Sequence, residues 1–424
     1  MEKLAIIGTG IAGMASAYYL KDKYELTIYE KNNYVGGHTN TVTIDEDGEE
    51  VNIDTGFMVY NEVTYPNLTN LFKELNVETK NTDMSFSVQH KVSDLEFSGS
   101  GLDGLFSQRK NLFSPKYWKM LLQINRFNKE CMEVFSDKRY YDYSIREYVE
   151  AKKFGNEFLN KYLIPMSSAV WSTPPNKMLD FPAKTLIRFF HNHGFLGLDT
   201  QHQWKTVVNG SKSYRDKIIE SFKDKITTNN GAIKVGQNGS KIDVIDSNNS
   251  KSTFDKVIFA CHADEALALL DDPTGLDKML LSNFKYEKNE VNLHTDSSVM
   301  PKTKKAWSSW NYRIDGENED IKTTTIYYMN SLQGVSENKD YFVSVNGAYL
   351  IDPAKIIKSF NYDHPLFDLN AINAQSHLQK LNEQGNYYFC GSYFRYGFHE
   401  DALSSAIDLS KKLLEEDVQK ISHI

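Results

Sequence analysis

The sequence predicts an α/β protein that contains a parallel, Rossmann-type sheet, with a second, α+β region inserted into the chain. Three stretches predict this fold: KLAIIG followed by GTGIAG and MASAYYL, the apolar run YELTIYE, and NYYFCGS close to the C-terminus. Short apolar runs bounded by turn residues are typical of buried parallel strands, and a glycine-rich turn between such a strand and a helix is typical of a dinucleotide-binding unit.

Composition limits the kind of protein. The 424 residues are 40% hydrophobic and 13% aromatic, which is enough for a large core and favours two domains. A net charge of −8 provides no general attraction to nucleic acid, so no nucleic-acid partner is expected. The three cysteines have no CxxC spacing, which argues against a metal site and favours the reducing cytoplasm.

No signal peptide or membrane-spanning segment is expected. The first predicted strand begins within the first three residues, which is too early for a signal peptide. No uninterrupted apolar run has the length that a membrane-spanning helix needs.

The first glycine motif predicts where the dinucleotide binds. Gly8 permits a tight turn, Gly10 lets the backbone approach a pyrophosphate, and Gly13 lets the helix pack closely on the strand. Glu30, at the end of the second strand, is expected to accept the ribose hydroxyls, and an acid there disfavours a 2′-phosphate. The predicted contacts of this motif are Gly8, Gly10, Ile11, Ala12, Gly13, Glu30 and Lys31.

A second glycine pair follows in the stretch YEKNNYVGGHTNTVTID. It is either the turn of a β-hairpin or an extra set of backbone donors for a cofactor larger than a nicotinamide dinucleotide. A hairpin should alternate apolar and polar residues on both flanks; TVTID alternates and YEKNNYV does not.

These stretches resemble a known family. IIGTGIAGMASAYYL, YEKNNYVGGHTNT and VNIDTGFMV resemble the N-terminal FAD-binding region of the flavin amine oxidase and phytoene desaturase superfamily. GGHTNT, IDTGFMVYNEVTYPNL, ACHADEAL, LHTD and GFHEDAL further resemble a bacterial group of FAD-dependent oxidoreductases associated with cyclopropane and other modified fatty-acyl chains. The resemblance implies an oxidoreductase enzyme with a Rossmann-type FAD domain of the GR2-like kind, a returning C-terminal segment and noncovalent FAD.

The resemblance also implies site residues. His38 stands where the superfamily usually has arginine, the segment after strand NYYFC holds the ribityl phosphate, and the start of the last helix faces the flavin. The cofactor-binding residues implied in this way are Gly36, Gly37, His38, Thr39, Gly56, Phe57, Met58, Val59, Ala232, Gly391, Ser392, His399, Glu400, Asp401 and Ala402.

Two domains are predicted: a discontinuous FAD-binding domain (1–80, 206–285 and 381–424) and a substrate-binding domain (81–205 and 286–380). Within the second, residues 104–129 interleave basic and aromatic side chains, which predicts either contact with an anionic membrane surface or an ordinary solvated helix. Residues 163–198 are rich in apolar rings, which is typical of the wall of an apolar tunnel and equally of a core.

Catalytic residues are few in the sequence. Where amine oxidases carry a lysine near the flavin, the resemblance places Asn289, which argues against amine oxidation. His294 and Asp296 fit a structural bond better than a dyad, and Cys261 and His262, as strand neighbours, point to opposite faces. The polar candidates near the flavin ring are Tyr60, Arg395 and His399.

Three functions are compatible with the sequence. The favoured one is an FAD-dependent oxidoreductase that desaturates, oxidises or isomerises a long apolar substrate, a fatty acid or fatty-acyl lipid. An amine or amino-acid oxidase would instead have an aromatic cage and a small polar pocket. The third is a non-catalytic flavoprotein or lipid-binding module. The sequence carries no signal for an oligomeric state.

Overall fold

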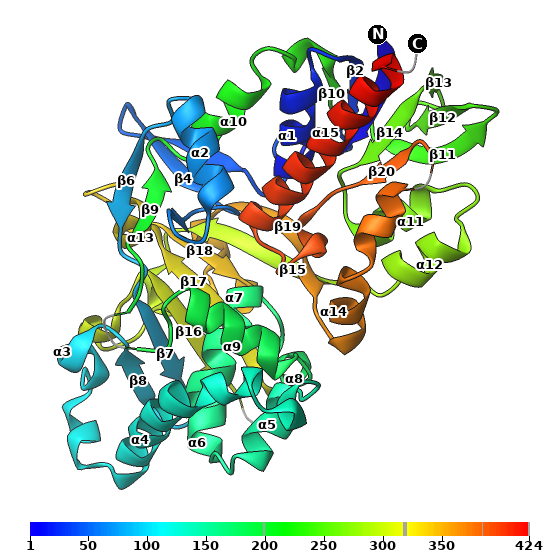
Figure 1. The fold of residues 1–424 in the computed structure, drawn as a ribbon. Helices are drawn as coiled ribbons and strands as arrows, with labels where there is room; N and C mark the ends of the chain where they lie inside the picture. Colours follow the sequence, from blue (N-terminus) through cyan, green and yellow to red (C-terminus); the bar gives the residue numbers. More distant parts are fainter. Residues whose placement is uncertain (198–199, 317–319, 384, 423–424) are drawn as a thin grey trace.

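The computed structural model describes residues 1–197, 200–316, 320–383 and 385–422. The remaining positions, 198–199, 317–319, 384 and 423–424, fall within the predicted domains and lie outside the described residues. Figure 1 shows two regions, each built around its own sheet, with both ends of the chain in the same region.

The first region contains a five-stranded sheet whose neighbouring strands are all parallel. Its strands, in spatial order, are β10 (Ile226–Thr227), β2 (Tyr24–Tyr29), β1 (Glu2–Ile7), β14 (Lys256–Phe259) and β20 (Tyr387–Phe389). The four apolar residues that end β1 are buried, as expected for a strand with a neighbour on each side and helices packed on the sheet. The predicted Rossmann-type α/β fold is therefore present.

Two helices from opposite ends of the chain cover one face of this sheet. α1 (Ile11–Leu20) follows the first glycine motif and packs against α15 (His399–Ser422), the last helix. α10 (Lys212–Ile219) packs beside α1. The antiparallel sheet of β11 (Ala232–Asn238), β12 (Lys241–Asp246) and β13 (Lys251–Phe254), followed by α11 (Ala263–Leu269) and α12 (Gly275–Leu281), completes this region.

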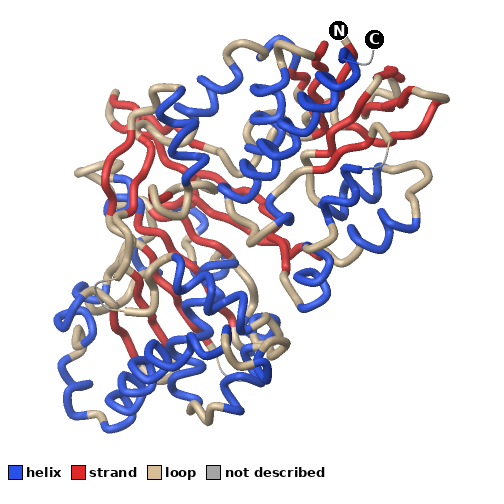
Figure 2. The backbone as a smooth tube through the Cα atoms, in the orientation of Figure 1, coloured by secondary structure: helices blue, strands red, loops and turns tan. Residues whose placement is uncertain are grey.

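The second region contains a seven-stranded, mostly antiparallel sheet with helices packed against it (Figure 2). Its strands, in spatial order, are β19 (Ile356–Leu366), β15 (Lys285–His294), β18 (Phe342–Val345), β17 (Lys322–Tyr328), β16 (Trp310–Asp315), β7 (Phe86–His90) and β8 (Leu95–Ser98). Between β8 and β9 (Trp204–Val207) the chain forms the helices α3 (Gly101–Leu105), α4 (Pro115–Glu130), α5 (Ile145–Ala151), α6 (Asn156–Phe158), α7 (Ile164–Trp171), α8 (Pro175–Met178) and α9 (Ala183–Asn192).

Small elements join the two regions. A hairpin of β3 (Thr41–Glu46) and β4 (Glu49–Asp54) follows the second glycine pair. The others are β5 (Tyr60–Asn61), β6 (Thr79–Thr82), β9 (Trp204–Val207), α2 (Pro66–Glu74), α13 (Met329–Gln333) and α14 (Leu369–Gln375). The long strands β15 and β19 extend from the second sheet toward the parallel sheet (Figure 1). The division into domains at the predicted residues stays a prediction.

Candidate active site: one cavity with two different walls

A cavity of about 860 Å³ lies between the two sheets and is lined by residues of both. The loops that leave the carboxyl ends of β1, β2, β14 and β20 form one wall, which is where parallel α/β sheets bind their ligands. Of the predicted cofactor residues, those that line it are Gly8, Gly10, Ile11, Ala12, Glu30, Lys31, Gly36, Gly37, His38, Gly56, Phe57, Met58, Val59, Ala232, Gly391, Ser392, His399 and Ala402.

The first glycine loop has the geometry that its sequence predicts. A Cβ added at Gly13 would lie 2.0 Å from the carbonyl oxygen of Gly8, so α1 can pack this closely only with glycine there. A Cβ added at Gly10 would have no atom within 4 Å. Gly10 therefore faces open cavity at the N-terminus of α1, where free N–H groups favour a phosphate.

Thr9, which the sequence analysis did not select, connects the two glycine motifs. Glu30 accepts hydrogen bonds from the Thr9 N–H at 3.1 Å and from the Thr9 hydroxyl, and also from the Asn32 N–H at 2.8 Å. The Gly36 N–H in turn donates to the Thr9 hydroxyl at 3.2 Å. Thr9 thus holds the predicted ribose acid and the second glycine pair together.

The second glycine pair packs against the first motif. A Cβ added at Gly37 would lie 3.3 Å from the Cα of Gly10. The hairpin begins only at Thr41, so the pair is a cofactor-facing loop that precedes the hairpin, not the hairpin turn itself. The interpretation of GGHTNT as an extension of the first site is therefore the one that fits the fold.

His38 provides an unused polar atom beside these loops. Its carbonyl accepts the Phe57 N–H at 2.7 Å, while its side-chain Nε2 is buried without a partner among the described residues. Burial, reinforced by repulsion from His364, His262 and His399, holds the pKa of His38 well below its usual range. An orphaned imidazole nitrogen next to an open glycine loop fits an anionic cofactor group.

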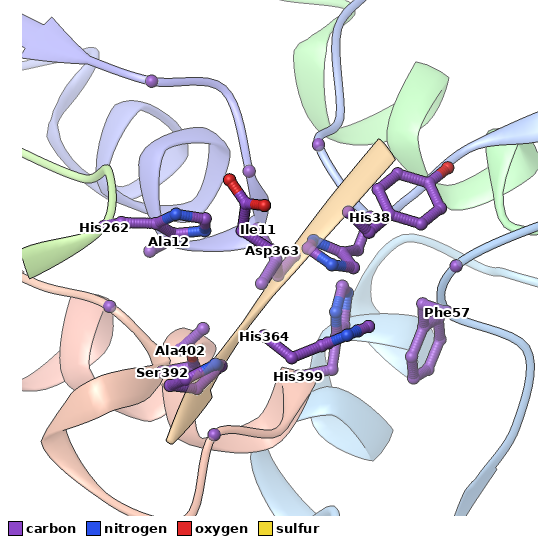
Figure 3. A pocket seen from close by; sticks show the side chains of 18 of the residues that line it. Ile11, Ala12, His38, Phe57, His262, Asp363, His364, Ser392, His399 and Ala402 are labelled. Atoms are coloured by element: carbon purple, nitrogen blue, oxygen red, sulfur yellow. The ribbon is translucent and has the colours of Figure 1, made fainter. Parts of the chain in front are cut away.

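The C-terminal segment contributes in part as predicted. Gly391, Ser392, His399 and Ala402 line the cavity, and the His399 ring stacks on Phe57 with 4.0 Å between centroids (Figure 3). Burial lowers the pKa of His399 to about 3. His399 Nε2 lies 2.6 Å from the Tyr214 hydroxyl.

The structure places four predicted cofactor residues outside the cavity wall. Gly13 faces Gly8 inside the fold, and the Thr39 hydroxyl bonds to Tyr214. The Glu400 carboxylate accepts the N–H groups of Asn67 and Leu68, each at 2.9 Å, at the start of α2. Asp401 accepts the N–H groups of Tyr396 and Phe398, and burial raises its pKa to about 7. Glu400 therefore caps the start of α2, and Asp401 holds the segment just before α15, and neither residue lines the cavity.

Two catalytic candidates need correction. Tyr60 is buried in β5 with its ring against Phe72, 5.2 Å between centroids, and does not line the cavity. The half-exposed Arg395 lies 3.7 Å from Asp408 and does not line it either. Both positions were chosen for closeness in sequence to cofactor motifs, but the chain turns their side chains away. Of the three candidates, only His399 lines the cavity.

The second wall of the cavity is aromatic. Phe189 and Phe398 stack with 4.8 Å between ring centroids, and Trp171 packs against both. The apolar side chains on this wall are Met84, Val170, Trp171, Phe189, Phe195, Trp204, Trp310, Tyr327 and Phe398. Several come from the predicted segment 163–198, which therefore contributes to the cavity as well as to the core.

Lysine is scarce around the cavity. Among the described residues that line it, the one lysine is Lys31, which forms an ion pair with Glu265. Asn289, in the place of the amine oxidase lysine, is fully buried and donates to His364 Nδ1 at 2.9 Å. His364 itself lines the cavity.

Of the two remaining polar pairs, His294 and Asp296 lie away from the cavity, whereas Cys261 and His262 line it. His294 Nε2 bonds to the Ser344 hydroxyl at 2.7 Å and Asp296 accepts from Lys355 at 3.0 Å, away from the cavity, as a structural role requires. Cys261 and His262 both line the cavity, although adjacent strand residues were expected to face opposite ways. His262 is the first residue before α11, where the strand has ended, and its ring stacks on Tyr286 at 4.2 Å.

Sequence reasoning missed most of β19. Its residues Asn361–Pro365 all line the cavity, and the Tyr362 ring stacks on His38 with 4.6 Å between centroids. The stretch NYDHP carries no glycine motif, so its only sequence signal is a cluster of polar and aromatic residues before a proline.

A parallel sheet with two adjoining glycine loops and an acid at the end of its second strand is the arrangement of a dinucleotide-dependent oxidoreductase. The model of the flavin-containing amine oxidoreductase family matches residues 11–356, and the chain belongs to that family. It is an enzyme with FAD as its cofactor, which confirms the predicted superfamily, fold and cofactor.

Individual relatives are more distant. A stretch of 79 residues is 38% identical to 15-cis-phytoene desaturase of Synechococcus elongatus, covering 18% of this chain and 16% of that protein. The fold is similar to that of a putrescine oxidase variant, with a TM-score of 0.70 and 12% identity over 98% of this chain and 99% of the other. It is also similar to the CLA-producing fatty acid isomerase of P. acnes, with a TM-score of 0.67 and 12% identity over 97% and 98% of the two chains.

The residues present fit FAD. The glycine loops and the N-terminus of α1 suit its pyrophosphate, Glu30 its ribose, and the start of α15 its ring. When bound, FAD would supply hydride transfer, and the residues that line the cavity would hold a substrate carbon there and exclude water. The apolar side chains of the aromatic wall would serve that exclusion.

No described helix is long and apolar enough to cross a bilayer. Among the described residues, no three His, Cys, Asp or Glu side chains form a group that could hold a metal ion.

Proposed function

We propose that this protein is an FAD-dependent oxidoreductase that desaturates, oxidises or isomerises a long apolar substrate, a fatty acid or fatty-acyl lipid. The observation that carries the proposal is the aromatic wall of Trp171, Phe189 and Phe398, which continues the cavity beyond the glycine loops with apolar surface. An acyl chain can bury its methylene groups there, whereas an amine oxidase is expected to have a small polar pocket, which this long apolar wall does not resemble.

Two comparisons support the apolar substrate class. The partial similarity to a phytoene desaturase and the shared fold with a fatty acid isomerase both involve proteins whose names describe apolar substrates. The absence of a lysine from the aromatic wall, within the described residues, and the burial of Asn289 behind His364 separate this site from the predicted amine oxidase arrangement.

Chain length is the test of this proposal. Saturated and unsaturated fatty acids of eight to eighteen carbons are titrated into the FAD-loaded protein while the flavin absorbance is followed. Each added methylene should contribute about 0.8 kcal/mol, close to fourfold in affinity, until the cavity is filled. Anaerobic bleaching of the flavin by one of these lipids distinguishes an enzyme from a lipid-binding module.

Two outcomes would overturn the proposal. One is equal perturbation of the flavin by fatty acids of eight and eighteen carbons. The other is reduction of the flavin by primary amines alone. Mass spectrometry of lipid extracted from the purified protein gives an independent identification of the substrate class.

We further propose that the enzyme works in the cytoplasm as a peripheral protein that contacts anionic membranes through residues 104–129. This stretch carries six basic and no acidic residues in a chain of net charge −8. Phe113 is 87% exposed and Leu122 is 66% exposed. The exposed members of this basic apolar patch are Leu112, Phe113, Lys116, Trp118, Lys119 and Leu122.

The two faces of α4 differ, and each fits one of the two predictions for residues 104–129, membrane contact or an ordinary solvated helix. Tyr117, Met120 and Phe127 are buried, so α4 does contribute to the core. Trp118 and Leu122 lie one turn apart on the exposed face, and the Trp118 indole N–H donates to the Leu112 carbonyl at 2.9 Å. An exposed aromatic, apolar and basic surface is typical of proteins that lie on anionic lipid.

Charge reversal tests the membrane contact. The double variant Lys116→Glu and Lys119→Glu should reduce binding to vesicles containing anionic lipid by more than tenfold, since each lysine near such a surface contributes about 1 kcal/mol. The matched control is Lys23→Glu with Lys223→Glu, two exposed lysines of the FAD region. Equal loss in both variants, or binding that salt does not weaken, would contradict the proposal.

The cofactor is proposed to be noncovalent. Denaturation should release all of the yellow colour into the supernatant at one FAD per chain. Flavin that stays with the precipitated chain would show that a side chain holds it covalently.

A further inference from the structure

A chain of side-chain hydrogen bonds connects an exposed turn at the end of β18 to the cavity through the buried Asn289. Asn346 follows β18, Asn289 lies in β15 and His364 lies in β19, and the three bond in that order. Asn289 is fully buried, and His364 lines the cavity (Figure 3). None of the three has a role in the oxidation chemistry described above.

Backbone groups at both steps fix the direction of this chain. The Glu290 N–H donates to Asn346 Oδ1 at 3.1 Å, so the amide nitrogen of Asn346 is the group that donates to Asn289 Oδ1 at 2.7 Å. Asn289 Nδ2 also donates to the Glu287 carbonyl at 3.0 Å. Both bonds set the orientation of the Asn289 amide, and its nitrogen therefore faces His364 Nδ1 at 2.9 Å.

We propose that His364 carries its proton on Nε2 and that this N–H is a fixed hydrogen-bond donor to an oxygen of the ribityl phosphate chain of bound FAD. Nδ1 faces an N–H donor, so it must act as the acceptor. A neutral imidazole has one proton, which leaves it on Nε2. Asn289 and Asn346 act through His364 and are positioning residues.

The surroundings of His364 favour a neutral donor close to the phosphate end of the cofactor. Burial, with a smaller contribution from His262, lowers the pKa of His364 to about 4, so the ring is uncharged near pH 7. The His38 ring lies 5.2 Å away between centroids and directly follows the second glycine pair, which packs on Gly10. His364 is thus next to the loops that the fold provides for phosphate.

The tautomer can be observed directly. In FAD-loaded protein labelled with ¹⁵N-histidine, the long-range ¹⁵N–¹H pattern assigned to His364 by its loss in His364→Gln should be that of the Nε2–H form. Asn289→Leu should convert it to a mixture of forms. Asn292→Leu, which removes another buried asparagine of β15 that does not line the cavity, should leave it unchanged. A pure Nδ1–H pattern in the unaltered protein would overturn the proposal.

Cofactor affinity tests the donor itself. His364→Gln keeps an N–H donor and should hold the FAD dissociation constant within about twofold, whereas His364→Leu should raise it about three- to tenfold, the effect of one lost hydrogen bond. Thermal unfolding of the FAD-free variants controls for lost packing.

Two results would exclude cofactor recognition by this donor. One is an equal loss of FAD affinity in His364→Gln and His364→Leu, which would mean that ring shape matters and donation does not. The other is unchanged FAD affinity in His364→Leu together with weaker fatty acid binding, which would assign the donor to the substrate. Both results are read first from FAD affinity, so either one excludes the FAD donor whether or not the proposed acyl substrate is correct, and the fatty acid measurement only identifies the other partner of the donor.

Discussion

The two walls of the cavity are built in different ways. On the FAD side the backbone itself makes much of the surface, as where Gly37 meets Gly10, and the contact of Gly13 with Gly8 behind this surface holds α1 close to β1. On the opposite side the surface consists of side chains from separate segments, including Trp171, Phe189 and Phe398. The first wall depends on one residue type at each place, and the second depends only on apolar volume.

The two walls should therefore tolerate amino-acid substitutions differently. A Cβ added where backbones touch has little space, because close-packed backbone cannot yield without disturbing the elements around it. An aromatic wall can exchange one large apolar residue for another at modest cost, because the total volume is nearly kept. Substitutions in the glycine-loop wall should therefore change folding stability or FAD affinity, and substitutions in the aromatic wall should change which substrates bind.

The largest loss of stability is expected at Gly13, where α1 packs against the turn that follows β1. Gly13→Ala should destabilise the protein by about 3 kcal/mol, because its Cβ would lie 2.0 Å from the Gly8 oxygen. Gly10→Ala meets no atom within 4 Å, so the FAD-free protein should keep its stability while losing FAD affinity. Urea unfolding and FAD titration of both variants separate the two outcomes, and equal stability of the variants would contradict the packing argument.

Glu30 should show the next largest effect. Glu30→Ala removes a charged acceptor of the ribose hydroxyls, which costs about 1.5–3 kcal/mol, or tenfold to a hundredfold in FAD affinity. It also leaves the Thr9 N–H without its partner, so the unfolding midpoint of the FAD-free variant must be measured beside the titration. Unchanged FAD affinity would mean that another residue holds the ribose.

The pH dependence of the unfolding free energy tests His399 on the FAD side of the cavity. Its pKa in the fold is about 3, below the usual 6.5, so the unfolded chain binds the proton more readily and stability falls as pH drops below 6.5. Between pH 6.5 and 5.5 this histidine should account for about 1 kcal/mol of lost stability. Asp401, with its raised pKa, acts in the opposite sense.

The variant His399→Gln isolates the histidine contribution, because the carboxylates are the same in both proteins. Urea unfolding of the FAD-free forms at the two pH values should show a shallower pH dependence in the variant. Parallel curves would mean that His399 titrates in the fold as it does in the unfolded chain.

The contrast between the walls also explains what the sequence could predict. The βαβ unit, Glu30 and the second glycine pair follow from short motifs, since a backbone surface needs glycine at fixed spacings. The His38, Phe57 and His399 positions came from the resemblance, and the structure places all three at the cavity.

The failures share a physical cause. Thr9 is an ordinary residue within a glycine motif, and His364 lies in a strand whose partner Asn289 is far away in sequence. Tyr60 and Arg395 are near a motif in sequence, but Tyr60 packs into the core against Phe72 and Arg395 lies at the surface near Asp408. Long-range register and side-chain direction are properties of tertiary packing, which short motifs do not encode.

The smallest effect distinguishes a cavity wall from a core. Phe189 and Phe190 are neighbours on α9 and both are buried, but only Phe189 lines the cavity, as far as the structure describes it. Each substitution by leucine should cost about 1 kcal/mol of stability through lost packing. Phe189→Leu should in addition weaken binding of an eighteen-carbon fatty acid about two- to fivefold, because the acyl chain loses apolar contact area. FAD affinity should be unchanged in both, since neither ring touches the glycine loops. If Phe190→Leu weakens fatty acid binding as much as Phe189→Leu does, the acyl chain does not lie against this wall, and the aromatic surface is core alone.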